Sequence, residues 1–265
     1  MIKKLLSLKN EMIVENHQLL SFSSFFAKKK ECENNSNQKT AVFFPGCSLM
    51  SLGEDTVFEL YEILLKKHPD MGLSGFCCGK PSKHIRGGLK FSKRMDFIKK
   101  NHSQEIYTAC PNCYKTMGDA GMDVKSIWPV IDEFFPKEKL GMLYGQEMML
   151  HDPCTARNNE KDHEAVRSIM HKLGIKVVEF ENNRKKTLCC GKINMTMALN
   201  QEKGISILKK RVAECKTHKV ASYCASCVHS FGMAEKQGIY ISELMLDKKS
   251  RPSWGNRIKF VKNHF

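Results

Sequence analysis

The 265-residue chain contains no apolar run of about 18 residues, the length that a membrane-spanning helix requires. Its N-terminus is apolar and carries two lysines, as a signal peptide does, but Lys9, Glu11 and Glu15 interrupt the apolar stretch. No small-residue cleavage site follows them. We therefore expect a cytoplasmic protein that is not transmembrane.

Three common sequence signatures of enzymes are also absent. The chain has no P-loop, no Rossmann glycine fingerprint and no nucleophile-elbow motif. Nucleotide-dependent chemistry and hydrolase chemistry therefore have no support in the sequence.

Acidic residues are scarce: 28 Asp and Glu stand against 43 Lys and Arg, which gives a formal net charge of +15. Such an excess is typical of proteins that meet nucleic acid, an anionic membrane surface or an acidic partner. It overstates the charge of a protein whose cysteines bind metal as thiolates. Part of the excess lies in a C-terminal segment without acidic residues, which we interpret as a solvated tail: Lys248, Lys249, Arg251, Arg257, Lys259 and Lys262.

Cysteine, by contrast, is abundant. Twelve cysteines in a chain expected in the cytoplasm favour metal binding or redox chemistry over a disulfide framework. Ten of them form two sets of five in the same order, and equivalent cysteines lie 107 to 114 residues apart. The first set is Cys47, Cys77, Cys78, Cys110 and Cys113, and the second is Cys154, Cys189, Cys190, Cys224 and Cys227. This order indicates an internal duplication.

Short apolar segments alternate with helical ones in both halves of the chain. We expect strands at 41–44, 105–109, 124–128, 148–150, 219–223 and 238–241, and helices near 53–67, 88–101, 161–173 and 194–214. This alternation predicts an α/β fold of two similar Rossmann-like lobes with mostly parallel sheets, related by internal duplication. The cysteines follow strand ends, where open α/β sheets bind their ligands.

We divide the chain into four parts: an N-terminal helical and linker extension (1–40), a first lobe (41–146), a second lobe (147–246) and a basic C-terminal tail (247–265). Within the extension, residues 2–26 are expected to form an amphipathic helix. The main body of the protein, a partner protein and a membrane surface stay open as the surface that this helix contacts.

The spacing of the cysteines bears on the metal. A C-x2-C pair suits zinc, an iron–sulfur cluster or a metal-free dithiol site. Two adjacent cysteines have Cα atoms only about 3.8 Å apart, so they reach two metal ions of one cluster more readily than one tetrahedral zinc. Gly79 and Gly191 let the chain turn sharply after each adjacent pair. We favour iron–sulfur clusters, with zinc and dithiol chemistry left open.

Three residues outside the two sets are of types that could bind or contact a metal. Cys32 lies in the polar linker, and Cys215 ends a predicted helix as a packed, inert cysteine. We expect neither of them to be a ligand. His151 lies three residues before Cys154, and it is either a hydrogen-bonding group beside the metal or a histidine packed at a strand end.

Four segments resemble a known family, the cysteine-rich CCG domain. They are Phe44-Pro45-Gly46-Cys47, Cys77-Cys78-Gly79-Lys80-Pro81, Cys110-Pro111-Asn112-Cys113-Tyr114 and His151-Asp152-Pro153-Cys154. The domain occurs in the B subunit of heterodisulfide reductase, in iron–sulfur subunits of anaerobic glycerol-3-phosphate dehydrogenase and glycolate oxidase, and in the lactate-utilisation A protein. The resemblance covers about residues 41–246.

The resemblance implies that each complete set of five cysteines holds a non-cubane [4Fe-4S] cluster, so that all ten cysteines are ligands of two clusters. Zinc in one lobe is the alternative. Substrate would bind at a cluster, which makes Cys78 and Cys190 the candidate catalytic positions. Lys80 and Lys192 follow the two Cys-Cys-Gly segments and are candidates to stabilise a reduced cluster.

This chain departs from the family pattern in two places. The first set is slightly short between Cys47 and the adjacent pair, and Lys192-Ile193-Asn194 stands where relatives often have more glycine. No ferredoxin-type run of four cysteines precedes the repeat. Electrons would therefore come from an iron–sulfur or flavin subunit.

The leading hypothesis is an iron–sulfur oxidoreductase subunit that transfers electrons and reduces a small disulfide, as the heterodisulfide reductase B subunit does. No nucleic-acid partner is expected. The first alternative is a non-catalytic electron-transfer subunit of a lactate, glycolate or glycerol-3-phosphate dehydrogenase complex. The second is a zinc-stabilised interaction or nucleic-acid-binding protein, which would show strongly salt-dependent binding.

Overall fold

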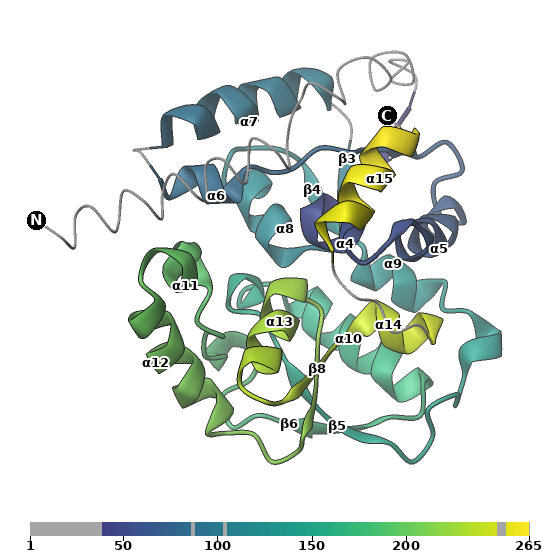
Figure 1. Cartoon of the computed structure of the whole chain (residues 1–265). Coiled ribbons are helices and arrows are strands. Elements are labelled where there is room, and N and C mark those ends of the chain that lie inside the picture. The colour runs from purple at the N-terminus through teal and green to yellow at the C-terminus, as the bar shows by residue number, and fades with distance from the viewer. Residues whose placement is uncertain (1–38, 86–87, 103–104, 248–252, 265) are drawn as a thin grey trace, which may run out of the picture.

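A computed structural model describes residues 39–85, 88–102, 105–247 and 253–264. Two lobes lie one above the other in Figure 1, the first in purple to blue and the second in green. The predicted helix over 2–26 and the linker cysteine Cys32 lie outside the described residues.

Each lobe is built on a sheet of four parallel strands. The first sheet has the order β2 (Gly72–Leu73), β1 (Ala41–Phe43), β3 (Glu105–Thr108), β4 (Val124–Ser126). The second has the order β6 (Lys176–Glu179), β5 (Glu147–His151), β7 (Lys219–Ser222), β8 (Gln237–Tyr240). The two orders are equivalent, which confirms the predicted α/β fold with two similar lobes.

Helices connect the strands and cover the sheets. In the first lobe they are α4 (Gly46–Met50), α5 (Glu54–Leu65), α6 (Lys80–Lys83), α7 (Leu89–Asn101), α8 (Pro111–Gly118) and α9 (Trp128–Glu133). The 3-10 turn η2 (Lys137–Lys139) leads to the second lobe, which holds η3 (Cys154–Ala156), α10 (Glu160–Lys172), η4 (Arg184–Lys186), η5 (Ile193–Met195), α11 (Thr196–Leu199), α12 (Gln201–Val212), α13 (Ala225–Met233) and α14 (Ile241–Leu246). Because helices flank the sheets, central strands such as β1 are buried along their whole length.

The helix expected at 194–214 is interrupted. Asn194 and Met195 have positive φ angles, +49° and +61°. Asn200 has non-helical backbone angles and separates α11 from α12. The Asn200 side chain accepts a hydrogen bond from the Lys203 backbone N–H and so caps α12 at its start. The single predicted helix is therefore wrong, and the observed elements are η5, α11 and α12.

One hydrophobic core runs through both lobes. Trp128, at the start of α9, is fully buried and makes edge-on contacts with Tyr223 and Tyr240 of the second lobe, at centroid distances of 6.3 and 6.0 Å. The Tyr240 hydroxyl donates to the Ala109 carbonyl at the end of β3. These contacts fix the cysteine-bearing edges of the two sheets relative to one another.

The last described helix, α15 (Trp254–His264), returns to the first lobe (yellow in Figure 1). Phe260 is fully buried against Phe58 of α5, and Lys259 pairs with Glu54 at 3.4 Å. Arg257 is only 2% exposed. The expectation of a solvated tail is therefore wrong for this helix, because its apolar face packs on α4 and α5.

Within the described part of the chain, no helix is both long enough and apolar enough to cross a membrane.

Candidate metal centres at the strand ends

The cysteines lie where the connections of each sheet change direction. In the first lobe, the chain leaves β1 toward one neighbour, β2, and β3 lies on the other side. Cys47 follows β1 in α4, and Cys110 and Cys113 stand at the start of α8 after β3. The second lobe repeats this placement with Cys154 after β5 and with Cys224 and Cys227 at the start of α13. The adjacent pairs Cys77-Cys78 and Cys189-Cys190 lie in loops outside the sheets, at the same edges. Such switch points are the usual ligand sites of open α/β sheets.

The five thiols of the first lobe form one continuous chain of contacts. Neighbouring thiols shift one another's pKa along the series Cys47–Cys77, Cys77–Cys78, Cys78–Cys113 and Cys113–Cys110. Cys77, Cys78 and Cys113 are each at most 3% exposed. The fold thus gathers sulfurs from three separate segments into one buried group.

The second lobe has the same chain of contacts. Here too neighbouring thiols shift one another's pKa, along the series Cys154–Cys189, Cys189–Cys190, Cys190–Cys227 and Cys227–Cys224. The adjacency matches the first lobe position by position. The duplication therefore extends from the order of the strands to the arrangement of the sulfurs.

Burial and the shared thiol protons spread the pKa values within each group. In the first lobe, hydrogen bonding with Cys113 lowers the pKa of Cys78 to about 5, whereas burial raises the pKa of Cys77 to about 12. In the second, hydrogen bonding with Cys154 lowers the pKa of Cys189 to about 2, and hydrogen bonding with Cys189 raises the pKa of Cys190 to about 12. Thiols that share protons in this way release them together to metal ions, which bind the thiolate form.

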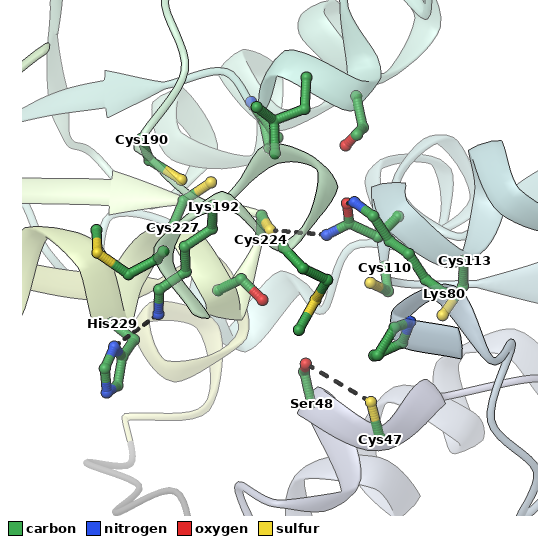
Figure 2. Close-up of a pocket in the computed structure, with 18 of the residues that line it drawn as sticks. Cys47, Ser48, Lys80, Cys110, Cys113, Cys190, Lys192, Cys224, Cys227 and His229 are labelled. Carbon is green, nitrogen blue, oxygen red and sulfur yellow. Dashed lines mark hydrogen bonds between the residues drawn. The ribbon is translucent and has the colours of Figure 1, made fainter. Parts of the chain in front are cut away.

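Both groups open into one cavity of about 460 Å³ between the lobes. In Figure 2, Cys190, Cys224 and Cys227 of the second lobe lie on one side of it, and Cys47, Cys110 and Cys113 of the first lie on the other. Nine of the ten cysteines line the cavity, and Cys189 joins them through its contacts with Cys154 and Cys190. A molecule in the cavity would be in reach of both groups.

A comparison with family models decides what these lobes are. The model described as CCG, the cysteine-rich domain, matches residues 41–118 and again residues 148–232. The chain belongs to the CCG cysteine-rich domain family. Among curated proteins, no sequence matches it.

Both CCG domains contain the donors that an iron–sulfur cluster requires. Each offers five sulfurs and a glycine that brings backbone N–H groups to them. Gly79 and Gly191 have positive φ angles, +69° and +90°, and donate to the sulfurs of Cys77 and Cys189 at 3.3 Å each. These positive φ angles place the amide hydrogens next to groups that become anionic. The residues present therefore fit a metal or iron–sulfur centre.

Polar side chains of one domain reach the sulfurs of the other. Asn112 of the first domain donates its Nδ2–H to the sulfur of Cys224 at 3.5 Å, and Lys80 donates to Asn112. The charge of Lys80 favours the Cys224 thiolate. Lys80 was expected to stabilise a reduced cluster, and in the structure its charge acts on a sulfur of the second domain.

Lys192 also lines the cavity, in the second domain. Its Nζ lies 2.7 Å from Nδ1 of His229, and burial lowers its pKa, which the Cys190, Cys224 and Cys227 thiolates partly oppose. Among the described residues that line the cavity, none is acidic. The cavity therefore presents cations and sulfur, with methionine as its main apolar lining.

His151 lies at the end of β5 and is fully buried. One of its ring nitrogens and the sulfurs of Cys190 and Cys227 all lie within 4.8 Å of one another. Burial, with the charge of Arg211, lowers the pKa of His151 to about 3. His151 is therefore packed at a strand end, as one of the two sequence interpretations has it, and it also lies near the sulfurs; a hydrogen bond beside a metal stays a prediction.

Sequence reasoning missed Asn112 and Arg211. Asn112 stands between Cys110 and Cys113, and a polar residue inside a C-x2-C pair signals a possible sulfur contact, though not one across two domains. Arg211 lies in α12, sixty residues from the histidine that it contacts, and only the fold brings them together. Cys215 is half-buried beside a small apolar cluster with Met149 and Phe231, as expected for a packed cysteine.

Proposed function

We propose that the chain is an iron–sulfur oxidoreductase subunit, similar to the heterodisulfide reductase B subunit. It reduces a small disulfide substrate that binds in the cavity between its two CCG domains. The observation that carries this proposal is the single cavity lined by both groups of cysteines. A structural zinc site does not need a cavity beside it, because its four protein ligands complete the coordination of the metal.

Cys47, Cys77, Cys78, Cys110 and Cys113 would hold one non-cubane four-iron cluster, and Cys154, Cys189, Cys190, Cys224 and Cys227 the other. When bound, these clusters supply electrons one at a time. Conversion of a disulfide into two thiols takes up two electrons and two protons.

The protein's own residues would position the substrate. Met195, Met197 and Met233 line the cavity with flexible apolar side chains, which suit the carbon chain of a small disulfide. Lys80 and Lys192 supply the positive charge that a reduced, more negative centre requires. The electrons would come from a partner iron–sulfur or flavin subunit.

The test is whether a disulfide reoxidises the reduced protein. Protein purified without oxygen is reduced with dithionite, freed of excess reductant and mixed with a panel of small disulfides while the cluster absorbance is followed. We expect stoichiometric reoxidation with release of two thiols per disulfide. Cys215→Ser serves as the control that removes a thiol outside both groups.

Two other outcomes would contradict the disulfide proposal. Clusters that resist every disulfide but pass electrons rapidly to a flavin or ferredoxin-type protein would favour the non-catalytic electron-transfer subunit. Zinc in place of iron would favour the structural alternative.

A further inference from the structure

The two CCG domains differ at one buried position beside the sulfurs. The residue three places before the first cysteine of each set is Phe44 in the first domain and His151 in the second. Both side chains are fully buried at the end of the central strand. One domain therefore has an apolar ring where the other has a ring that carries hydrogen-bonding nitrogens.

The His151 ring is held from several sides. Arg211 donates its Nε–H to Nδ1 of His151 at 3.1 Å. Phe180 and Phe231 contact the ring edge-on, with centroids 6.0 and 5.1 Å away. The ring is consequently fixed in orientation by packing as well as by the hydrogen bond.

Arg211 is itself anchored. Its side chain is fully buried, its guanidinium lies 3.6 Å from the centroid of the Phe180 ring, and it donates to the Asn182 carbonyl and to Glu214. Arginine in a protein has only donors and does not lose its proton. The hydrogen bond to His151 therefore has one possible direction.

This direction fixes the tautomer of the histidine. Nδ1 must be the acceptor, so the ring proton of the neutral imidazole is on Nε2. A protonated ring would set its Nδ1–H against the Nε–H of Arg211. A ring that bound a metal through Nε2 would meet the same conflict, because its proton would move to Nδ1. The geometry thus leaves His151 as a hydrogen-bond donor rather than a ligand.

The Nε2–H of His151 needs a hydrogen-bond acceptor. Nε2 is buried and has no hydrogen-bond partner among the described residues, and a ring nitrogen lies within 4.8 Å of the sulfurs of Cys190 and Cys227. Since Nδ1 accepts from Arg211, Nε2 is the ring nitrogen that carries a proton to donate to them. A buried N–H without a partner is costly unless a nearby acceptor uses it.

We propose that His151, oriented by Arg211, donates its Nε2–H to the sulfurs of Cys190 and Cys227 and thereby raises the reduction potential of the centre in the second domain. The proposal rests on the proposed function, since it needs an iron–sulfur centre there. Hydrogen bonds to ligand sulfurs stabilise the added negative charge of the reduced state and are a main determinant of cluster potentials. Phe44 cannot supply such a bond in the first domain.

Other groups near the sulfurs do not replace this donor. Asn112 donates to Cys224, a different sulfur of the second group, and Arg257 acts on Cys47 and Cys77 of the first. The two domains thus present different electrostatic surroundings to equivalent sets of ligands. In this arrangement His151 draws electrons toward the second domain, where Lys192 lies and on whose Cys224 the charge of Lys80 acts.

The test replaces His151 with the residue that the first domain already has. His151→Phe protein, purified without oxygen, is titrated with redox mediators while each centre is followed by electron paramagnetic resonance. We expect the potential of one centre to fall and that of the other to stay. The equilibrium constant for electron transfer between them should change at least tenfold, which corresponds to about 59 mV for one electron.

Two further variants separate tuning from packing. His151→Gln keeps an N–H donor and should restore part of the lost potential. His102→Phe removes a buried histidine of the first domain, whose Nε2 faces Ser74, and should leave both potentials unchanged. Unchanged potentials in His151→Phe, or equal effects of the Phe and Gln substitutions, would overturn the proposal.

A measurement on the unaltered protein covers the case in which His151→Phe fails to assemble. Protein labelled with ¹⁵N-histidine is studied by pulsed paramagnetic resonance. A weak coupling of a histidine nitrogen to one centre is expected, and a strong coupling, as from a directly bound nitrogen, or no coupling would overturn the proposal. Iron and sulfide analysis separates the two levels: missing clusters contradict the proposed function itself, whereas two intact clusters with an unshifted potential contradict the role of His151 alone.

Discussion

At the scale of single residues, the ten clustered cysteines form two groups of thiols whose charges, once ionised, are not compensated by the protein alone. Buried thiols that lie together repel one another as soon as more than one of them ionises. Hydrogen bonding lowers the pKa of Cys78 in the first group and of Cys189 and Cys224 in the second, while the pKa values of their neighbours rise. Metal cations remove this conflict because they compensate all of the thiolates at once. The residues therefore make sense as ligands rather than as a redox-inactive packing cluster.

Removing one ligand from each group should show that the centres are independent. Cys78→Ser and Cys190→Ser should each lose about half of the bound iron, because only one cluster is disrupted. Iron per chain is measured by inductively coupled plasma spectrometry, with Cys215→Ser as the control that keeps all of it. Complete loss in both variants would show instead that the two centres assemble only together.

The two turns that follow the adjacent cysteines should differ in their tolerance of a side chain. A Cβ on Gly191 would lie 2.4 Å from the Gly204 carbonyl oxygen, whereas one on Gly79 would meet the flexible Arg94 side chain at 2.6 Å. Gly191→Ala should therefore cost about 3 kcal/mol of unfolding free energy and Gly79→Ala about 1 kcal/mol. Urea unfolding measures both, and equal losses would contradict the difference in surroundings.

Asp162 in α10 provides a pH-dependent test. Its side chain is buried, and burial raises its pKa to about 7. Because the folded pKa lies above the unfolded value of about 4, the stability is full below about pH 4 and falls as the pH rises toward 7. Asp162→Asn should remove this loss and raise the unfolding free energy at pH 8 by about 4 kcal/mol, with little change at pH 4.

A neighbouring substitution controls for charge alone. Glu160→Gln removes an exposed carboxylate from the same first turn of α10 and should change stability little at either pH. If Asp162→Asn were no more stabilising at pH 8 than at pH 4, the Asp162 carboxyl would not be the group that titrates.

At the scale of elements, the regular alternation of apolar and helical segments was sufficient to predict the central strands and the long helices α5, α7 and α10. The edge strands β2 and β6 were missed. The first has only two residues, Gly72 and Leu73, and the second, beginning at Lys176, is only half-buried, so neither shows a strong apolar pattern. The interruption of the helix expected at 194–214 was missed because it depends on non-helical backbone angles, positive φ at Asn194 and Met195 and φ −146° at Asn200, that the sequence does not indicate.

The packing of α15 was also beyond local reasoning, and it is open to direct test. Phe260 is fully buried against α5, whereas Ile258 on the same helix is 53% exposed. Phe260→Ala should lower the unfolding free energy by about 3 kcal/mol, and Ile258→Ala by less than about 0.5 kcal/mol. Similar small effects of both substitutions, measured by urea unfolding, would show that the helix does not contribute to the folded lobe.

At the scale of the whole molecule, the repeat in the sequence predicted two equivalent domains, but not how they face one another. The shared core around Trp128 sets that arrangement, and it places two five-sulfur groups on one cavity of about 460 Å³. Contacts that cross between the domains, such as Asn112 with Cys224, follow from this packing and have no local signature. The function proposed for the chain is therefore a property of the pair of domains rather than of either one.

The central claim is that each CCG domain assembles its own iron–sulfur cluster. The most direct measurement is the content of iron, zinc and acid-labile sulfide per chain in protein purified without oxygen. We expect about eight irons with a comparable amount of sulfide, because each group of cysteines would hold four irons. Zinc without sulfide would contradict it and would make the cysteine groups structural metal sites.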